Sequence, residues 1–241
     1  MLKVGICDDE RIFADIIRNS VAKIFNKAGM DVSVSTYVSS VTLASELSEK
    51  SFNALFLDID MPVASGFDIS RLVRETSPDT YIIFISSKHD LVYSSFEYNP
   101  FYFICKTDVA TLQGELENVC GKLMQHYQQH RKLTIADPSW GKIVLRISDI
   151  LYIKSEKHYL IYYPAGKVIT YTERGSLAAK RDELGCGDFL VPHQRYLVNM
   201  RHIAKFGGNV NTVTMDNGDE IPLSKSCRAE ALREFLKYSR R

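Results

Sequence analysis

The first half of the chain alternates short apolar runs with longer segments of helical periodicity. The apolar runs are residues 2–7, 32–37, 54–57, 81–85 and 101–105. Between the first two runs, apolar side chains recur every three or four residues until Gly29, and this spacing predicts an amphipathic helix. A second helical pattern follows the fifth run and extends from Val109 to Met124. Repeated alternation of this kind predicts a doubly wound α/β fold with a five-stranded parallel sheet.

The pattern changes in the second half. Beyond Pro138, β-branched and aromatic runs are separated by turn residues such as the Asn217-Gly218 pair, which is typical of a type I′ hairpin turn. Helical spacing occurs at 176–184 and 224–238, so a mainly β domain is predicted. The predicted organisation is a first domain at 1–124, a polar linker at 125–137 and a second domain at 138–241.

The composition excludes several classes of protein. With 241 residues, 45% apolar and 24% charged, the chain has ordinary globular values. No apolar run approaches the roughly 18 residues of a membrane-spanning helix, and the N-terminus leads into a predicted strand rather than a signal peptide. The five cysteines are widely spaced and form no Cys-x-x-Cys pair, which argues against a disulfide framework or a cysteine metal site. We therefore expect a cytoplasmic protein with reduced thiols.

The net charge of +1 conceals opposite balances in the two halves. Residues 1–126 hold 11 Lys and Arg against 17 Asp and Glu, a balance of −6, whereas residues 127–241 hold 19 against 12, a balance of +7. A basic domain is attracted to polyanions such as nucleic acids. The second half is the candidate for that role, although a surplus of this size also occurs on surfaces that only confer solubility.

Carboxylates, hydroxyls and one ammonium group directly follow four of the five apolar runs. These residues are Asp8, Asp9, Asp58, Ser86, Ser87 and Lys106. Because the C-terminal ends of parallel strands open on one edge of the sheet, we expect these side chains to share a site. Taken singly, the Asp8-Asp9 pair is typical of a helix N-cap, so the prediction depends on all four loops together.

Three clustered carboxylates repel one another unless a cation joins them. Mg²⁺ suits such a site because it takes hard oxygen ligands, usually only one or two of them carboxylates, and leaves positions for water and phosphate oxygens. A carboxylate beside such a metal can act as a nucleophile toward a phosphoryl group and form an acyl phosphate. The pattern therefore predicts a site for Mg²⁺ and phosphate, with Ser86 and Lys106 as donors to the phosphate oxygens.

In order and spacing, residues 1 to about 124 resemble the receiver domain of bacterial two-component response regulators. The matching residues are Asp8-Asp9, Asp58 with Pro62 and Gly66 after it, Ser86 and Lys106. The resemblance implies the flavodoxin-like fold, with Asp58 as the phosphoacceptor. The implied Mg²⁺ ligands are Asp9, Asp58 and the backbone carbonyl of Asp60, with Asp8 assisting. The implied phosphoryl contacts are Ser86 and Lys106, and the implied switch residues are Ser86 and Phe103.

One departure from that family concerns the residue after the lysine, and one rival family shares a motif. Thr107 follows Lys106 where receivers usually have proline, often after a cis bond. A cis bond before a residue other than proline costs about 2.5 to 4 kcal/mol. A trans bond is therefore open to Lys106–Thr107, and it would place the lysine differently from the lysine of the family. Asp58-Ile59-Asp60 also fits the D-x-D motif of haloacid-dehalogenase phosphatases, but that motif lies on their first strand. We therefore favour the receiver.

Residues 138 to about 238 resemble the LytTR DNA-binding domain of the AgrA/LytR family. The resemblance rests on the runs ISDILYIKSEKHYLIYY and FLVPHQRYLVNMRHI, the second of which holds an H-x-x-Y-L-V-N signature from His193 to Asn199. It implies a mostly β module that contacts DNA through loops rather than through a recognition helix. The implied DNA contacts are His158, Gln194 and Lys225, with Arg195 and Arg228 as phosphate contacts.

Together, the two resemblances imply a bacterial response regulator that regulates transcription and is not an enzyme. A sensor histidine kinase is expected to phosphorylate Asp58, after which the chain forms a homodimer and binds tandem repeats in promoter DNA. The alternative is a phospho-switched module whose second domain binds protein. Salt-dependent DNA association distinguishes the two.

Overall fold

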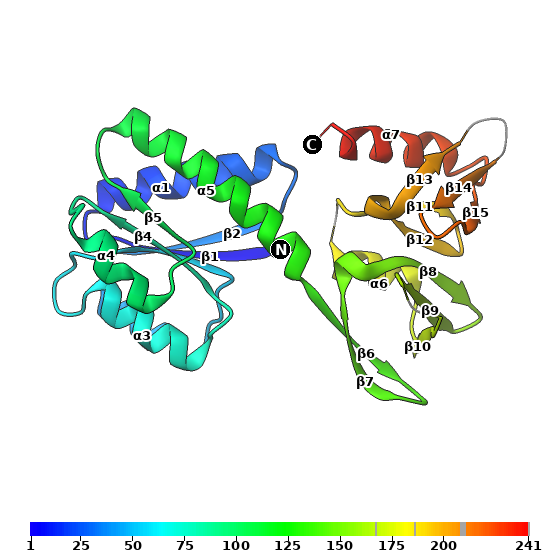
Figure 1. Cartoon of the computed structure of the whole chain (residues 1–241), viewed down its shortest axis with the longest axis horizontal. Helices are drawn as coiled ribbons and strands as arrows, with labels where there is room; N and C mark the ends of the chain where they lie inside the picture. Colours follow the sequence, from blue (N-terminus) through cyan, green and yellow to red (C-terminus); the bar gives the residue numbers. More distant parts are fainter. Residues whose placement is uncertain (167, 186, 208–210, 241) are drawn as a thin grey trace. The chain divides into compact units, whose positions relative to one another are not determined.

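The computed structural model describes residues 1–166, 168–185, 187–207 and 211–240. They form two compact units, Met1–Met124 and Gln125–Arg241, which are described separately (Figure 1). Among the described residues, no helix has both the length and the apolar character needed to cross a lipid bilayer. Four of the five cysteines are free thiols, and Cys186 lies outside the described residues.

The first unit contains a five-stranded parallel sheet in the order β2-β1-β3-β4-β5. Its strands are β1 Leu2–Cys7, β2 Val32–Tyr37, β3 Ala54–Asp58, β4 Tyr81–Ser86 and β5 Tyr102–Cys105. Its helices are α1 Arg11–Lys27, α2 Ser40–Glu46, α3 Gly66–Thr76, α4 Leu91–Ser95 and α5 Val109–His130. This strand order is the flavodoxin-like one, so the predicted fold class is confirmed.

Helices cover both faces of this sheet, and the sheet is therefore buried (Figure 1). All five residues of β3 are buried, as expected for a central parallel strand. Successive side chains of a strand point to opposite faces. Leu55 and Leu57 of β3 pack in one core with Ile69 of α3. On the other face, the Ser20 hydroxyl of α1 donates a hydrogen bond to Gln113 Oε1 of α5 (2.7 Å).

The second unit is mainly β, as predicted. A five-stranded antiparallel sheet has the order β10-β9-β8-β12-β11, with a three-stranded sheet β13-β14-β15 and a hairpin β6-β7. The strands are β6 Lys132–Asp137, β7 Gly141–Arg146, β8 Ile150–Glu156, β9 Tyr159–Pro164, β10 Tyr171–Arg174, β11 Phe189–His193, β12 Tyr196–Asn199, β13 Ile203–Phe206, β14 Thr212–Met215 and β15 Glu220–Pro222. The helices are α6 Leu177–Leu184 and α7 Arg228–Tyr238.

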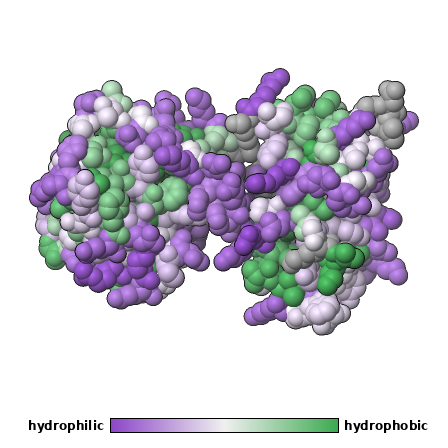
Figure 2. All heavy atoms as spheres, viewed as in Figure 1, coloured by the Kyte–Doolittle hydropathy of each residue, from purple (hydrophilic) through white to green (hydrophobic). Residues whose placement is uncertain are grey.

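Two apolar clusters stabilise the second unit. One lies between the β6–β7 hairpin and the large sheet, around Ile135, Ile153 and Tyr162. The other joins the large sheet to β14 and α7 and includes Val198 and Val213. Figure 2 shows apolar side chains on the surface of this unit as well. The exposed large hydrophobic residues of the unit include Trp140, Val144, Val168 and Ile169.

The segment predicted as a polar linker, residues 125–137, consists of regular secondary structure. Helix α5 continues to His130, and after Arg131 the six residues Lys132–Asp137 form β6. Glutamine and histidine are tolerated in a helix, so the polar composition did not mark its end. In β6, buried and exposed residues alternate, with Leu133 and Ile135 facing the core, and this period of two is the signal that was overlooked.

The turn at Asn217-Gly218 also differs from the type I′ prediction. Gly218 has a φ of +90°, but Asn217 has no positive φ. Gly218 N donates to Met215 O (3.0 Å), and Met215 N donates to Asp219 O (2.9 Å). This is the pattern of a three-residue loop in which a type I turn precedes a left-handed glycine.

Candidate functional site

The ends of β1 and β3 bring three carboxylates together. Asp8, Asp9 and Asp58 can each place one carboxylate oxygen within 4.8 Å of the other two. Asp8 and Asp58 are 1% and 6% exposed, whereas Asp9 is exposed to solvent. The carboxylates are close because β1 and β3 are parallel and Cys7 is aligned with Leu57. The residues that follow, Asp8 and Asp58, therefore lie side by side.

Lys106, at the end of β5, reaches into this cluster. Its Nζ lies 2.8 Å from Asp8 Oδ2 and 2.7 Å from Asp58 Oδ2, and the three side chains are almost completely buried. Burial alone would lower the pKa of the lysine, but Asp58 and Asp8 outweigh that effect and leave the pKa raised. Lys106 is therefore charged at neutral pH. The Lys106–Thr107 peptide bond is trans, so the lysine reaches both acids without the cis bond of the family.

The carboxylates of this cluster can ligate a cation. Burial raises the pKa of Asp8, although the Lys106 ammonium lowers it in part. Asp8 Oδ2 is buried, and its contact with Lys106 does not have hydrogen-bond geometry, so this oxygen is left without a hydrogen-bond donor. Carboxylate oxygens this close to one another are the hard ligands that Mg²⁺ takes. The residues present therefore fit the metal that the sequence predicted.

The position of Asp58 depends on the start of α3. A Cβ at Gly66 would lie 2.2 Å from Asp58 O, so only glycine allows α3 to begin so close to the end of β3. Ser65 and Asp68 form a capping box that fixes this helix end. Asp60 N also donates to Asp58 Oδ1 (3.3 Å), which orients the carboxylate.

Ser86 and Phe103, the predicted switch residues, make their contacts outside the acid cluster. Ser86 is fully buried at the end of β4, and its hydroxyl accepts a hydrogen bond from Lys88 N (3.1 Å). Phe103 of β5 is half-buried and packs against the core that β3 shares with α3. Lys88 was not selected from the sequence, yet its Nζ lies 2.8 Å from Asp60 Oδ2 in an exposed ion pair. In the sequence, Lys88 could have been found only from its position two residues after Ser86.

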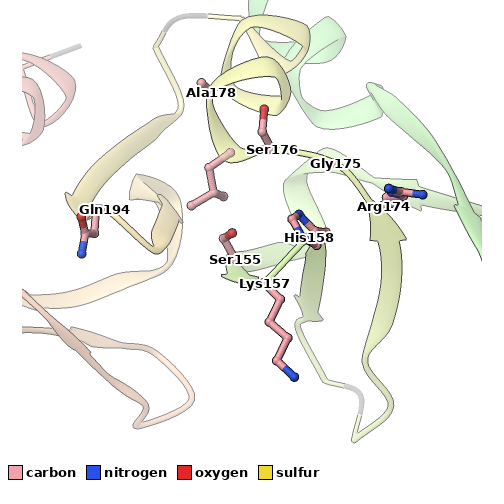
Figure 3. A pocket seen from close by; sticks show the side chains of 9 residues that line it. Ser155, Lys157, His158, Arg174, Gly175, Ser176, Ala178 and Gln194 are labelled. Atoms are coloured by element: carbon pink, nitrogen blue, oxygen red, sulfur yellow. The ribbon is translucent and has the colours of Figure 1, made fainter.

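In the second unit, two predicted DNA contacts line one pocket. It has a volume of about 460 Å³ and is bounded by the β8–β9 turn, the β11–β12 turn and the first turn of α6 (Figure 3). His158 enters from the first turn and Gln194 from the second. The hydrogen bond from Ser155 N to Arg195 O (2.8 Å) holds the two turns together. The same pocket is lined by Lys157 and by Arg174, which the sequence analysis did not select.

The other three predicted DNA contacts do not line this pocket. Arg195 is exposed next to Gln194, and Lys225 is exposed in the turn before α7. That turn is attached to β11 through the bond from Ser224 N to Pro192 O (2.9 Å). Arg228, the first residue of α7, donates to Asn211 Oδ1 (3.0 Å). The structure thus places the turn before α7 beside the end of β11, and neither Lys225 nor Arg228 belongs to the pocket lining.

Comparison with known families agrees with this architecture. Residues 4–116 match the response regulator receiver domain, and residues 141–237 match the LytTr DNA-binding domain. The chain belongs to the response regulators that join these two domains. Such proteins regulate transcription.

Particular relatives span the chain or one of its halves. The sensory transduction protein LytT of Bacillus subtilis strain 168 is 22% identical over 250 residues, covering 98% of this chain and 99% of that protein. The receiver domain of AraT from Geobacillus stearothermophilus aligns at 26% identity and a TM-score of 0.43, over 52% of this chain and 97% of that one. A LytTr domain from Bacillus cereus aligns at 25% identity and a TM-score of 0.38, over 44% and 95%.

Proposed function

We propose that Asp58 accepts a phosphoryl group from a sensor histidine kinase and that this controls DNA binding by the second domain. The observation that carries the proposal is the buried cluster in which Lys106 contacts both Asp8 and Asp58 at the C-terminal edge of the sheet. Structural ion pairs are seldom built from two buried acids and one base, because they leave excess charge buried. The excess negative charge is explained if the site binds a cation together with the phosphoryl group.

The transfer needs a nucleophile and groups that neutralise charge. An oxygen of Asp58 attacks the phosphorus of the kinase phosphohistidine, the P–N bond breaks, and an acyl phosphate forms on Asp58. Lys106 is already 2.7 Å from Asp58 Oδ2 and turns to a phosphoryl oxygen, while the Ser86 hydroxyl donates to another. Held by Asp9, Asp58 and the backbone carbonyl of Asp60, with Asp8 assisting, Mg²⁺ would supply positive charge opposite the phosphoryl oxygens.

The response is proposed to pass from these donors to the rest of the chain. When Ser86 moves toward the phosphoryl group, Phe103 turns into the space it leaves, and the changed surface favours a homodimer. Paired second domains then bind tandem repeats in promoter DNA, with His158, Gln194 and Lys225 as base contacts and Arg195 and Arg228 on phosphates. A regulator of this kind works in the cytoplasm, where the DNA is, and acts by binding rather than as an enzyme.

Phosphorylation is tested by incubating the full chain with Mg²⁺ and acetyl phosphate. We expect a hydroxylamine-labile label on the natural chain and on Asp79→Asn, which alters an exposed acid in the turn before β4, but none on Asp58→Asn. Chelation of Mg²⁺ should also prevent labelling. If Asp58→Asn acquires the same label, the phosphoacceptor assignment is wrong.

DNA binding is tested by selecting duplexes from a random pool with the full chain. We expect an affinity that falls with salt along a straight log-log line, since each phosphate contact releases counterions. A folded chain without measurable affinity for DNA at low salt would instead support the alternative in which the second domain binds protein.

A further inference from the structure

Two cations stand at the rim of the pocket between the predicted DNA-reading turns. Lys157 belongs to the β8–β9 turn, and Arg174 is the last residue of β10. Figure 3 shows Gln194 on one side of the pocket, Arg174 on the other side and His158 between them. The charged ends of Lys157 and Arg174 extend outward from the pocket, in the direction of solvent.

The charge at this rim is not balanced locally. Among the described residues that line the pocket, none is acidic. Neither Lys157 nor Arg174 forms an ion pair with a residue that the structure describes. Glu156 pairs with Lys154 (3.2 Å), and Glu173 is held by Lys180 (2.6 Å) inside the unit. The rim therefore offers two free positive charges to an anion.

The backbone at Lys157 gives independent support for a role of its side chain. Lys157 and His158 form a two-residue connection between β8 and β9, in which Glu156 pairs with Tyr159. Lys157 has a φ of +55°, in the left-handed region that a residue with a Cβ seldom adopts. Glycine would suit this position better if only the turn mattered. A residue with a Cβ in a strained backbone conformation indicates a functional role when it lies in a turn that lines a pocket.

We propose that the DNA backbone crosses the second domain over this pocket, with Lys157 and Arg174 each contacting a backbone phosphate. The inference rests on the proposed DNA binding and adds two residues to it. Long, exposed, flexible cations suit phosphates, whereas the shorter side chains of His158 and Gln194 suit base edges in the groove. The two cations would fix the register in which those side chains meet the bases.

The proposal is tested with the full chain and the variants Lys157→Gln and Arg174→Gln. Lys142→Gln is the matched control, because it removes an exposed cation from β7, away from the pocket lining. Each test variant should flatten the log-log salt slope by about one unit for each bound protomer. Its affinity should fall several-fold, by the same factor on a selected duplex and on a random-sequence duplex, because phosphates carry no sequence information. The control should change neither quantity.

A second measurement identifies the phosphates themselves. Single methylphosphonates, which remove one backbone charge at a time, are scanned along the selected duplex. At one position the substitution should weaken the natural chain and leave Arg174→Gln unchanged, and at another it should do the same for Lys157→Gln. Unaltered thermal melting of the variants shows that they are folded.

The outcomes separate this inference from the proposed function. If the natural chain binds no DNA, both fail. If it binds and the two variants keep its salt slope, the proposed function stands and the phosphate contacts are wrong. A loss confined to the selected duplex would show that these residues read bases, which also overturns the inference.

Discussion

At the scale of single residues, Lys106 determines the electrostatics of the receiver site. It lies within 2.8 Å of two buried acids, so it compensates a repulsion that the fold itself creates. Removing one partner of a buried ion pair is costly because the remaining charge has no solvent around it. Lys88 and Asp60 also pair at 2.8 Å, but both are about half exposed, and such pairs contribute little.

Replacing Lys106 with methionine should therefore destabilise the first unit by about 3 kcal/mol. Lys88→Met, the exposed counterpart, should cost less than about 1 kcal/mol. Mg²⁺ should raise the melting temperature of Lys106→Met more than that of the natural chain, since the metal replaces the missing positive charge. Chemical unfolding measures the losses of stability, and thermal unfolding with and without Mg²⁺ measures the melting temperatures, both followed by circular dichroism. Equal losses for the two variants would show that the buried cluster is not the source of the effect.

At the scale of elements, the start of α3 shows how a helix end places a reactive side chain. The sequence marked Gly66 only through its spacing from Asp58. In the structure the glycine is needed because α3 begins against the backbone of β3. The contrast is with Gly114 of α5, where a Cβ would meet nothing within 4 Å.

Gly66→Ala should destabilise the first unit by about 2 kcal/mol, the usual scale for overpacking, and should slow phosphorylation of Asp58. Gly114→Ala should instead stabilise it by about 0.5 to 1 kcal/mol, because alanine loses less backbone entropy in a helix. Unfolding curves and labelling rates of the two variants check this pair of predictions. A harmless Gly66→Ala would mean that α3 is free to shift away from β3.

A second element-scale feature is Asp137, which ends β6. Its carboxylate accepts hydrogen bonds from Thr172 N (2.6 Å), Ser139 N (2.8 Å) and Trp140 N (3.0 Å). The bond from Thr172 and those from the turn lower the pKa of Asp137. A carboxylate with a lowered pKa stabilises the fold above its ordinary pKa of about 3.9 and loses that contribution as the pH falls through its lowered value.

Asp137→Asn should therefore lower the melting temperature at pH 7, and the difference from the natural chain should shrink toward pH 3. Asp182→Asn, an exposed acid of α6, is the control and should behave like the natural chain at both pH values. Thermal unfolding across this pH range provides the measurement. A difference that grows in acid would contradict the assigned role of the charge.

At the scale of the whole molecule, α5 connects the two units without an irregular linker. Its last turn belongs to the second unit, in which the Ser148 hydroxyl donates to Gln129 O (3.2 Å). The next residue after the helix, Arg131, donates to Leu184 O (2.5 Å) and lies near Asp188 (3.9 Å). The last turn of α5 and the residue after it thus belong to the packing of the second unit.

Arg131→Ala should destabilise the second unit by about 2 kcal/mol, since a hydrogen bond from a charged group is lost. The chain has one tryptophan, Trp140, and it lies in the second unit, so its fluorescence reports the unfolding of that unit alone. We expect Arg131→Ala to shift the fluorescence transition in urea and Lys106→Met to leave it in place. A shift of the fluorescence transition in both variants would show that the two units unfold as one.

The sequence by itself determined the features that depend on local periodicity. The five strands of the first unit, the mainly β second unit and the acids at the ends of β1 and β3 follow from apolar runs and the residues directly after them. A strand that is buried on both faces must be apolar at every position. A central parallel strand and the polar residues at its end can therefore be recognised in the sequence alone.

Only the tertiary structure decided which distant residues meet. The pairing of Lys88 with Asp60, the attachment of Arg131 to Leu184 and the place of Arg174 beside His158 have no local pattern. They depend on strand order and on which loops share an edge, and these are set by packing between segments far apart in the chain. The strand β6, in the segment predicted as a linker, likewise depends on its pairing with β7.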